Sequence, residues 1–148
     1  MFIREEHGDR RRHLPLLLLA DEQESMVDRY LDEGMMYVLE VDGTVVGECV
    51  VNEAGDGVLE IKNIAVNPSH QHRGYGRMLI DFVAKRHTGK YDILQVGTGD
   101  SPLTVPFYER CGFERSHVAE GFFTENYDHP IFEGGAQLVD MVYLRKRL

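Results

Sequence analysis

Residues 36 to 66 constrain the fold more than any other stretch, because they hold three apolar, β-branched runs separated by two glycine turns. The first two runs lie in MYVLEVDGTVVGECVV and meet at Asp42-Gly43, a pair that is typical of a tight β-hairpin. GDG at 55–57 then turns the chain into VLEIKNIAV. The pattern predicts three consecutive strands.

Other segments add helices and strands around this unit. MFIR predicts a short first strand, and Leu14 to Ala20 a short buried helix with Pro15 near its start. DEQESMVDRYLDEG (21–34) predicts a second helix, capped by Asp21 or Ser25 and stopped at Gly34. Later come a glycine loop with its helix, the strand DILQVGTG, the helix LTVPFYERCGF, and two final strands, FERSHVA and AQLVDMVYLRK. This order predicts a single α+β (α/β-like) domain over residues 1–148.

Charge and cysteine content exclude some classes of function. The formal net charge of −9 argues against a nucleic-acid binder; it favours cationic small molecules or peptides as partners, or simply maintains solubility. Cys49 and Cys111 show no metal-ligand spacing, which suits a reducing, cytoplasmic location. RRRHLPLLLLADE resembles an export signal, but Pro15 interrupts it and a first helix packed on a sheet explains its leucines equally well. No stretch is long enough to predict a membrane span.

The loop NPSHQHRGYGRM (67–78) is the strongest functional motif. A dinucleotide fingerprint fails because the third glycine position is Leu79, and a Walker loop fails because Gly89-Lys90 is followed by Tyr91. A glycine loop between a strand and a helix can still bind an anion through bare backbone N–H groups and the positive end of the helix dipole. The alternative is a tight turn without a ligand.

The helix after this loop has an apolar face that would bury against a sheet. Tyr75, Leu79, Phe82 and Val83 follow helical spacing. Arg73 and Arg77 lie near the helix N-terminus, where the dipole disfavours cations. Their placement makes more sense if an anion binds there.

Q-x-x-G-x-G after a strand, followed further on by FYERCGF, resembles the GNAT superfamily of acyl-CoA-dependent N-acetyltransferases. The match runs from about Leu59 to Phe113. The resemblance implies a single mixed central sheet of about six to seven strands flanked by helices, with acetyl-CoA as co-substrate and no metal.

The resemblance also implies roles for individual residues. Ile64, Ala65 and Val66 would lie beside the pantetheine arm, with the Val66 N–H polarising the thioester carbonyl. Many members carry asparagine seven residues before the tyrosine of FYER, but here that position is Ser101, whose hydroxyl could replace the contact to the cofactor. The residues expected at the pyrophosphate are Gln71, His72, Arg73, Gly74, Tyr75 and Gly76.

Two residues are the candidates for proton transfer. Glu60 lies where several members carry a general base, and a carboxylate on a strand facing the cleft can deprotonate an ammonium; strand alternation would equally produce a solvent-facing glutamate there. Tyr108 lies where members carry a tyrosine near the thioester sulfur, and a phenol can protonate a departing thiolate. Packing in the core is its alternative.

The segment GFFTENYDHPIFEGG (121–135) combines aromatic and acidic side chains, which attract a cationic amine. We expect a substrate-side wall or lid, with Phe123, Glu125 and Tyr127 as candidate substrate-binding residues; a surface flap or dimer contact is the alternative. His70-x-His72 lacks a third ligand and is expected to face solvent or phosphate rather than a metal.

The predicted activity is acetyl transfer to a primary amine, either a small cationic molecule or a peptide or lysine amine. A non-catalytic acyl-CoA-binding sensor is the alternative from another class, and an N-terminal protein acetyltransferase is the third possibility. The final strand could swap or pair across a homodimer.

Overall fold

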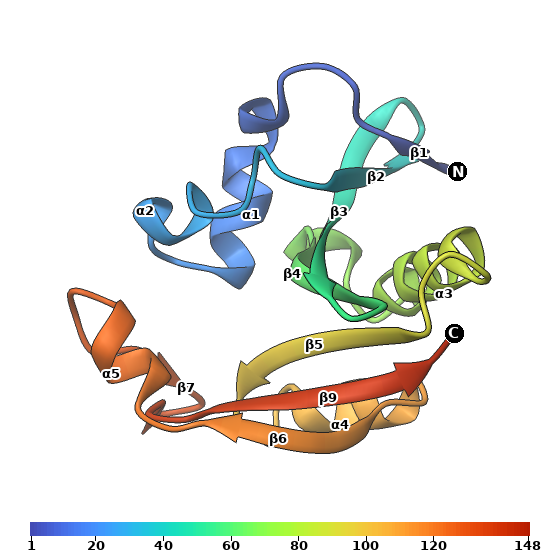
Figure 1. The fold of residues 1–148 in the computed structure, drawn as a ribbon. Coiled ribbons are helices and arrows are strands. Elements are labelled where there is room, and N and C mark those ends of the chain that lie inside the picture. The colour runs from blue at the N-terminus through green and yellow to red at the C-terminus, as the bar shows by residue number, and fades with distance from the viewer.

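The computed structural model describes all 148 residues and contains one mixed sheet of seven strands in the order β1-β2-β3-β4-β5-β9-β6 (Figure 1). Neighbouring strands are antiparallel except β4 and β5, which are parallel. A separate two-stranded hairpin pairs β7 with β8. The strands are β1 (Phe2–Glu5), β2 (Met35–Val41), β3 (Thr44–Gly55), β4 (Val58–Val66), β5 (Ile93–Gly99), β6 (Glu114–Ala119), β7 (Phe132–Glu133), β8 (Ala136–Gln137) and β9 (Met141–Arg147).

The predicted three-strand unit is confirmed as β2, β3 and β4. Asp42 and Gly43 both have positive φ, 51° and 79°, and Asp56 and Gly57 have 51° and 76°. Two successive residues with positive φ give the turn whose twist matches that of the flanking strands. The local sequence therefore determines both hairpins.

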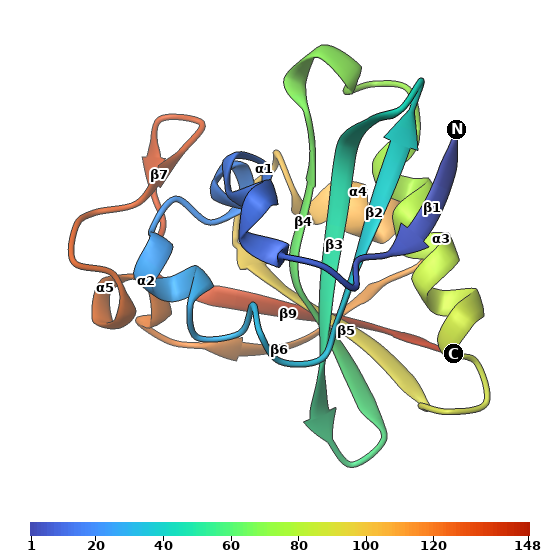
Figure 2. The same cartoon turned by 90° about the horizontal axis from the view of Figure 1, so that it is seen from above.

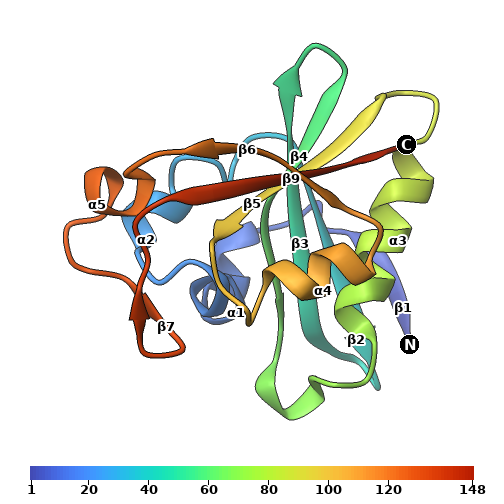
Figure 3. The same cartoon turned by 90° about the horizontal axis from the view of Figure 1, so that it is seen from below.

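Helices cover the two faces of the sheet in pairs (Figures 2 and 3). On one face, α3 and α4 bury Leu79, Ile80 and Val105 in the larger apolar cluster. On the other face, Leu17 and Val27 of α1 and α2 pack in a second cluster. The helices are α1 (Leu14–Ala20), α2 (Glu24–Val27), α3 (Tyr75–His87), α4 (Val105–Arg110) and α5 (Phe122–Asn126), with short 3-10 turns η1 (Arg10–His13) and η2 (Pro68–His70).

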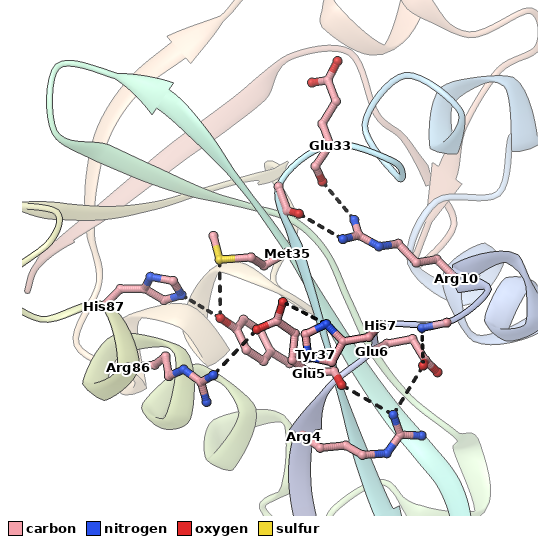
Figure 4. A network of polar contacts seen from close by, with 12 residues as sticks. Arg4, Glu5, Glu6, His7, Arg10, Glu33, Met35, Tyr37, Arg86 and His87 are labelled. Carbon is pink, nitrogen blue, oxygen red and sulfur yellow. Dashed lines mark hydrogen bonds and ion pairs between the residues drawn. The ribbon is translucent and has the colours of Figure 1, made fainter.

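Two predicted boundaries are wrong. The second helix covers only Glu24–Val27; its N-cap is Gln23, while Asp21 is the C-cap of α1. Its continuation is replaced by a loop held by Arg10, whose guanidinium donates to the carbonyls of residues 31, 33 and 34 at 2.7, 3.1 and 3.0 Å (Figure 4). The predicted last strand begins at Met141 rather than at Ala136, because residues 136–137 pair with β7 instead.

Polar contacts tie the start of the chain to α3 (Figure 4). The Tyr37 hydroxyl lies 2.9 Å from Nε2 of His87, and Arg86 lies 3.6 Å from the Glu5 carboxylate.

The final strand, β9, lies between β5 and β6, so both of its edges are paired. No helix of the structure is both long and apolar enough to cross a bilayer.

The feature that creates a site is the divergence of β4 from β5. The two strands pair only from Val58–Ile61 to Ile93–Val96. Beyond Ile61 the edge of β4 that faces β5 has no partner strand. The residues that follow, 64–66, therefore line a gap in the middle of the sheet.

Candidate functional site

A cleft of about 400 Å³, which we name the loop cleft, lies between the end of β4 and the N-terminus of α3. The backbone N–H groups of residues 72 to 77 donate no hydrogen bond to the protein; the first helical bond is from Met78 N–H to the Gly74 carbonyl. Gly74 has φ 82° and His72 φ 63°, which exposes these donors. Residues lining the cleft include Ile64, Ala65, Val66, Gln71, His72, Gly74, Tyr75, Gly76 and Tyr108.

The loop is locked to β4 by Gln71. Its Nε2 donates to the Val66 carbonyl at 3.0 Å. The Asn67 N–H donates to the Val46 carbonyl on the β3 side, so the N–H of the preceding Val66 points the other way, into the gap. Bare N–H groups at the helix start and along a free strand edge fit a phosphate group and an extended amide-bearing arm.

A second cavity of about 380 Å³, the inner cavity, adjoins the loop cleft. Leu19, Ala20, Ile64 and Tyr108 line both spaces and so form their common wall. Aromatic and aliphatic side chains predominate in its lining, but Asp21, Glu22 and Glu133 add three carboxylates. The inner cavity therefore combines apolar walls with acidic groups.

Tyr108 is the polar side chain on the common wall. It is 8% exposed and packs against Phe107 and Phe113. Its hydroxyl makes no hydrogen bond with the protein. The pKa of the Tyr108 hydroxyl is raised above its ordinary value. Burial is the largest cause, followed by the thiols of Cys49 and Cys111 and the carboxylate of Glu133. A protonated, unpartnered hydroxyl is a ready donor to an atom at the junction.

Glu60 lies outside both of these spaces. It lines a third cavity of about 330 Å³, the outer cavity, on the α1 and α2 side of the sheet. Its carboxylate accepts from Lys62 Nζ at 2.8 Å and from Gln95 Nε2 at 2.5 Å, and Gln95 in turn accepts from Arg145. The structure therefore places Glu60 in a polar network rather than beside Tyr108.

Three other predicted residues also lie outside the loop cleft and inner cavity. Ser101 is buried and its Oγ accepts from the Leu103 N–H in the turn before α4. Arg73 is exposed at the tip of the loop, and Glu125 is exposed on α5. The local sequence pattern predicted these residues at the site but did not reveal that their side chains lie outside it.

The segment 121–135, which contains α5 and β7, docks against the loop between α1 and α2 (Figures 1 and 2). Tyr127 donates to Asp21 Oδ1 at 2.8 Å, and Tyr30 donates to Asp21 Oδ2 at 3.0 Å. The Asp128 N–H reaches Gln23, and His129 lies 3.2 Å from Glu22. Phe123 and Tyr127 both line the inner cavity, as a wall on the substrate side would.

Several residues of the site were missed by sequence reasoning. Asn63, on β4, is 3% exposed and donates to the Leu17 carbonyl and to the Tyr30 hydroxyl. Gly97 and Gly99 on β5 form part of the cavity wall, and a Cβ at either would lie 2.6 Å from Met141 or Leu138. Their only sequence signal is a pair of glycines inside a strand, which indicates a close approach.

Comparison with known proteins agrees with this geometry. The family model described as an acetyltransferase (GNAT) domain matches residues 32–115. An uncharacterised N-acetyltransferase of Bacillus subtilis, YvbK, is 37% identical over 131 residues, which are 87% of this chain and 84% of that protein.

Solved structures match over nearly the whole chain. A GNAT family acetyltransferase from Elizabethkingia anophelis with acetyl-CoA bound superposes with TM-score 0.94 at 32% identity, covering 99% of this chain and 97% of the other. A Bacillus subtilis acetyltransferase in complex with CoA gives 0.89 at 34% identity, with the same coverage. The chain belongs to the GNAT family of N-acetyltransferases.

Proposed function

We propose that the protein transfers the acetyl group of acetyl-CoA to a primary amine by direct attack in a ternary complex, in the cytoplasm. The observation that carries the proposal is Tyr108, whose free hydroxyl stands in the wall between the loop cleft and the inner cavity. Two adjoining spaces with one proton donor between them suit a two-substrate transfer. Two related structures contain acetyl-CoA or CoA, which supports this choice of donor.

In this proposal the loop cleft binds acetyl-CoA, the acetyl donor. The free N–H groups of 72–76 hold the pyrophosphate, with Gln71 fixing the loop on β4. The open edge of β4 at residues 64–66 pairs with the pantetheine arm, and the Val66 N–H polarises the thioester carbonyl. The side chains of Arg73, at the loop tip, and Ser101, before α4, would contribute only after a rearrangement.

The inner cavity would hold the acceptor. Its carboxylates favour an amine that arrives as a cation, and its size favours a small molecule over a protein terminus. Contacts from Tyr127, Asp128 and His129 to the α1–α2 loop close one side, which also favours a small acceptor. Glu60 remains a predicted base that would act through water, and homodimer formation remains a prediction from sequence.

Replacement of Tyr108 by Phe tests the transfer mechanism. We expect kcat to fall about 10²-fold or more, because the departing CoA thiolate loses its proton donor. The KM for acetyl-CoA and the thermal midpoint should change little, since the hydroxyl makes no hydrogen bond in the folded protein. The measurement is thiol release with acetyl-CoA and a panel of diamines, polyamines, aminoglycosides, amino acids and short peptides.

Tyr91→Phe is the matched control, because Tyr91 packs against His87 away from both spaces. An unchanged kcat in Tyr108→Phe would remove this tyrosine from the mechanism. Binding of acetyl-CoA without turnover on any amine would favour the non-catalytic sensor. Turnover on peptides alone would favour the protein N-terminal acetyltransferase.

A further inference from the structure

Glu133 occupies a defined position in the wall of the inner cavity. It ends β7 and faces Ala136 in the β7–β8 hairpin, whose turn is formed by Gly134 and Gly135 with φ 58° and 81°. A Cβ at Gly134 would lie 3.3 Å from Leu103, a residue of the loop cleft, so the turn packs at the mouth of that cleft. The Glu133 side chain lines the inner cavity together with Tyr108.

Among the carboxylates of the inner cavity, Glu133 is the one without a partner. Asp21 accepts from the hydroxyls of Tyr30 and Tyr127. Glu22 is 53% exposed and lies 3.2 Å from His129. The side chain of Glu133 forms no hydrogen bond and no ion pair with any residue. Its lone pairs are therefore free for a group that enters the cavity.

The charge of Glu133 also acts on the proposed proton donor. Its carboxylate is one of the groups that raise the pKa of Tyr108, after burial and the two neighbouring thiols. Glu60 lines the outer cavity instead, where its carboxylate holds Lys62 and Gln95. The inner cavity thus holds a free carboxylate, whereas the carboxylate in the adjoining outer cavity is already occupied.

We propose that Glu133 is the general base that accepts the proton of the acceptor ammonium. This inference rests on the proposed function. The R–NH₃⁺ group gives one proton to the Glu133 carboxylate, and the free amine attacks the thioester carbon. The tetrahedral intermediate loses a second proton from nitrogen to water, the C–S bond breaks, and Tyr108 protonates the sulfur. Tyr108 then regains a proton from water and Glu133 releases its own, so that one proton leaves per turnover.

Replacement of Glu133 by Gln keeps the shape of the side chain and removes the base. With acetyl-CoA and the amine of the panel on which the wild type is most active, kcat/KM for the amine should fall about 10²-fold at pH 7. The loss should shrink as pH rises toward the pKa of the amine, about 10 for an alkylamine, because the substrate then arrives already neutral. The KM for acetyl-CoA should not change.

Two other variants make the result specific. Glu22→Gln removes a carboxylate of the same cavity that has a surface partner. It should weaken attraction of the amine equally at every pH at which the amine is charged, and so keep the shape of the wild-type pH profile. Glu60→Gln should also keep that profile, with any loss equal at all pH values. The thermal midpoint with and without CoA confirms that each variant is folded and binds the donor.

Three outcomes would overturn the proposal. Glu133→Gln could keep full activity across pH, or lose activity equally at every pH, which indicates a binding role. The pH-dependent loss could instead appear in Glu60→Gln, which would restore Glu60 as the base. A wild type inactive on every amine would overturn the proposed function itself, whereas an active wild type with an unaffected Glu133→Gln overturns only the assignment of Glu133.

Discussion

Glu48 is the residue whose placement is least expected from its chemistry. It is 0% exposed, and neither carboxylate oxygen has a hydrogen-bond partner. It pairs with Val38 on β2 and Ala65 on β4, on the face covered by α1 and α2. Burial raises its pKa well above the ordinary value, so the folded protein holds it as the neutral acid.

This placement makes stability depend on pH. A raised folded pKa means that the contribution of Glu48 is fully present below its unfolded pKa of 4.5 and is lost as pH rises toward the folded value. We expect Glu48→Gln to flatten the decline in unfolding free energy between pH 5 and 8, by at most about 1.4 kcal/mol per pH unit. Urea unfolding at several pH values measures this.

Glu53→Gln, at an exposed position of the same strand, should keep the wild-type slope. An identical slope in Glu48→Gln and the wild type would show that Glu48 does not bind a proton on folding. The sequence could not predict this residue's burial, because a single glutamate in an apolar strand usually faces solvent. Here helices cover both faces of the sheet at β3, so a side chain on either face of this strand points into packed side chains.

At the scale of elements, local chemistry predicted what depends on adjacent residues. The two Asp-Gly hairpins and the leucine helix at Leu14–Ala20 were correct because turn geometry and a proline at a helix start act within a few residues. The second helix was wrong because the chain leaves it after Val27 in tighter turns, such as the bond from the Arg29 N–H to the Met26 carbonyl. Arg10, from another part of the chain, fixes the carbonyls of residues 31, 33 and 34 that follow. The site follows the same division, since the loop N–H groups were predicted, whereas Asp21 and Glu133 come to line one cavity only through tertiary packing.

The docking of segment 121–135 gives a prediction at this scale. Tyr127 joins the segment to Asp21 of the α1–α2 loop by one hydrogen bond at 2.8 Å. Loss of that bond in Tyr127→Phe should loosen the wall of the inner cavity, because the other links, such as His129 to Glu22, lie at the surface. We expect the KM for the amine to rise about tenfold, roughly the effect of one hydrogen bond to a charged group at the low end of its range, about 1.5 kcal/mol.

Steady-state kinetics with each substrate varied in turn separates this effect from damage to the donor site. The KM for acetyl-CoA should stay at the wild-type value, as it should for both substrates in Tyr91→Phe. An unchanged KM for the amine in Tyr127→Phe would mean that the segment is held in place without this bond.

At the scale of the whole molecule, the divergence of β4 and β5 divides the sheet. Strands β1 to β4 form one half and β5, β9 and β6 the other, joined by the pairing of four residues on each strand. Neither periodicity nor turn signals reveal where two parallel strands part, so the sequence did not predict this feature; the family resemblance implied only that residues 64–66 lie beside the pantetheine arm. An acetyl-CoA molecule bound in the gap would contact both halves of the sheet and replace the missing pairing between β4 and β5.

Binding of CoA should therefore stabilise the folded protein as a whole. At a CoA concentration of 100 times Kd the gain is about 2.7 kcal/mol by mass action, which a thermal melt detects. Amide hydrogen exchange should slow most at the open edge of β4, residues 64–66, and at the free N–H groups of 72–77. Protection spread evenly over the chain would argue against binding in the gap.

Two glycine variants separate the loop from general stability. Gly74 and Gly43 have nearly the same φ, 82° and 79°, and a Cβ at either would meet no atom within 4 Å. Alanine should therefore strain the backbone equally at both sites, at a cost of about 1–2 kcal/mol. Only Gly74→Ala also covers the bare N–H groups of the loop, so we expect its affinity for CoA to fall about tenfold while Gly43→Ala binds normally. Equal affinities by calorimetry would show that the loop does not approach the phosphates closely enough for a methyl group to matter.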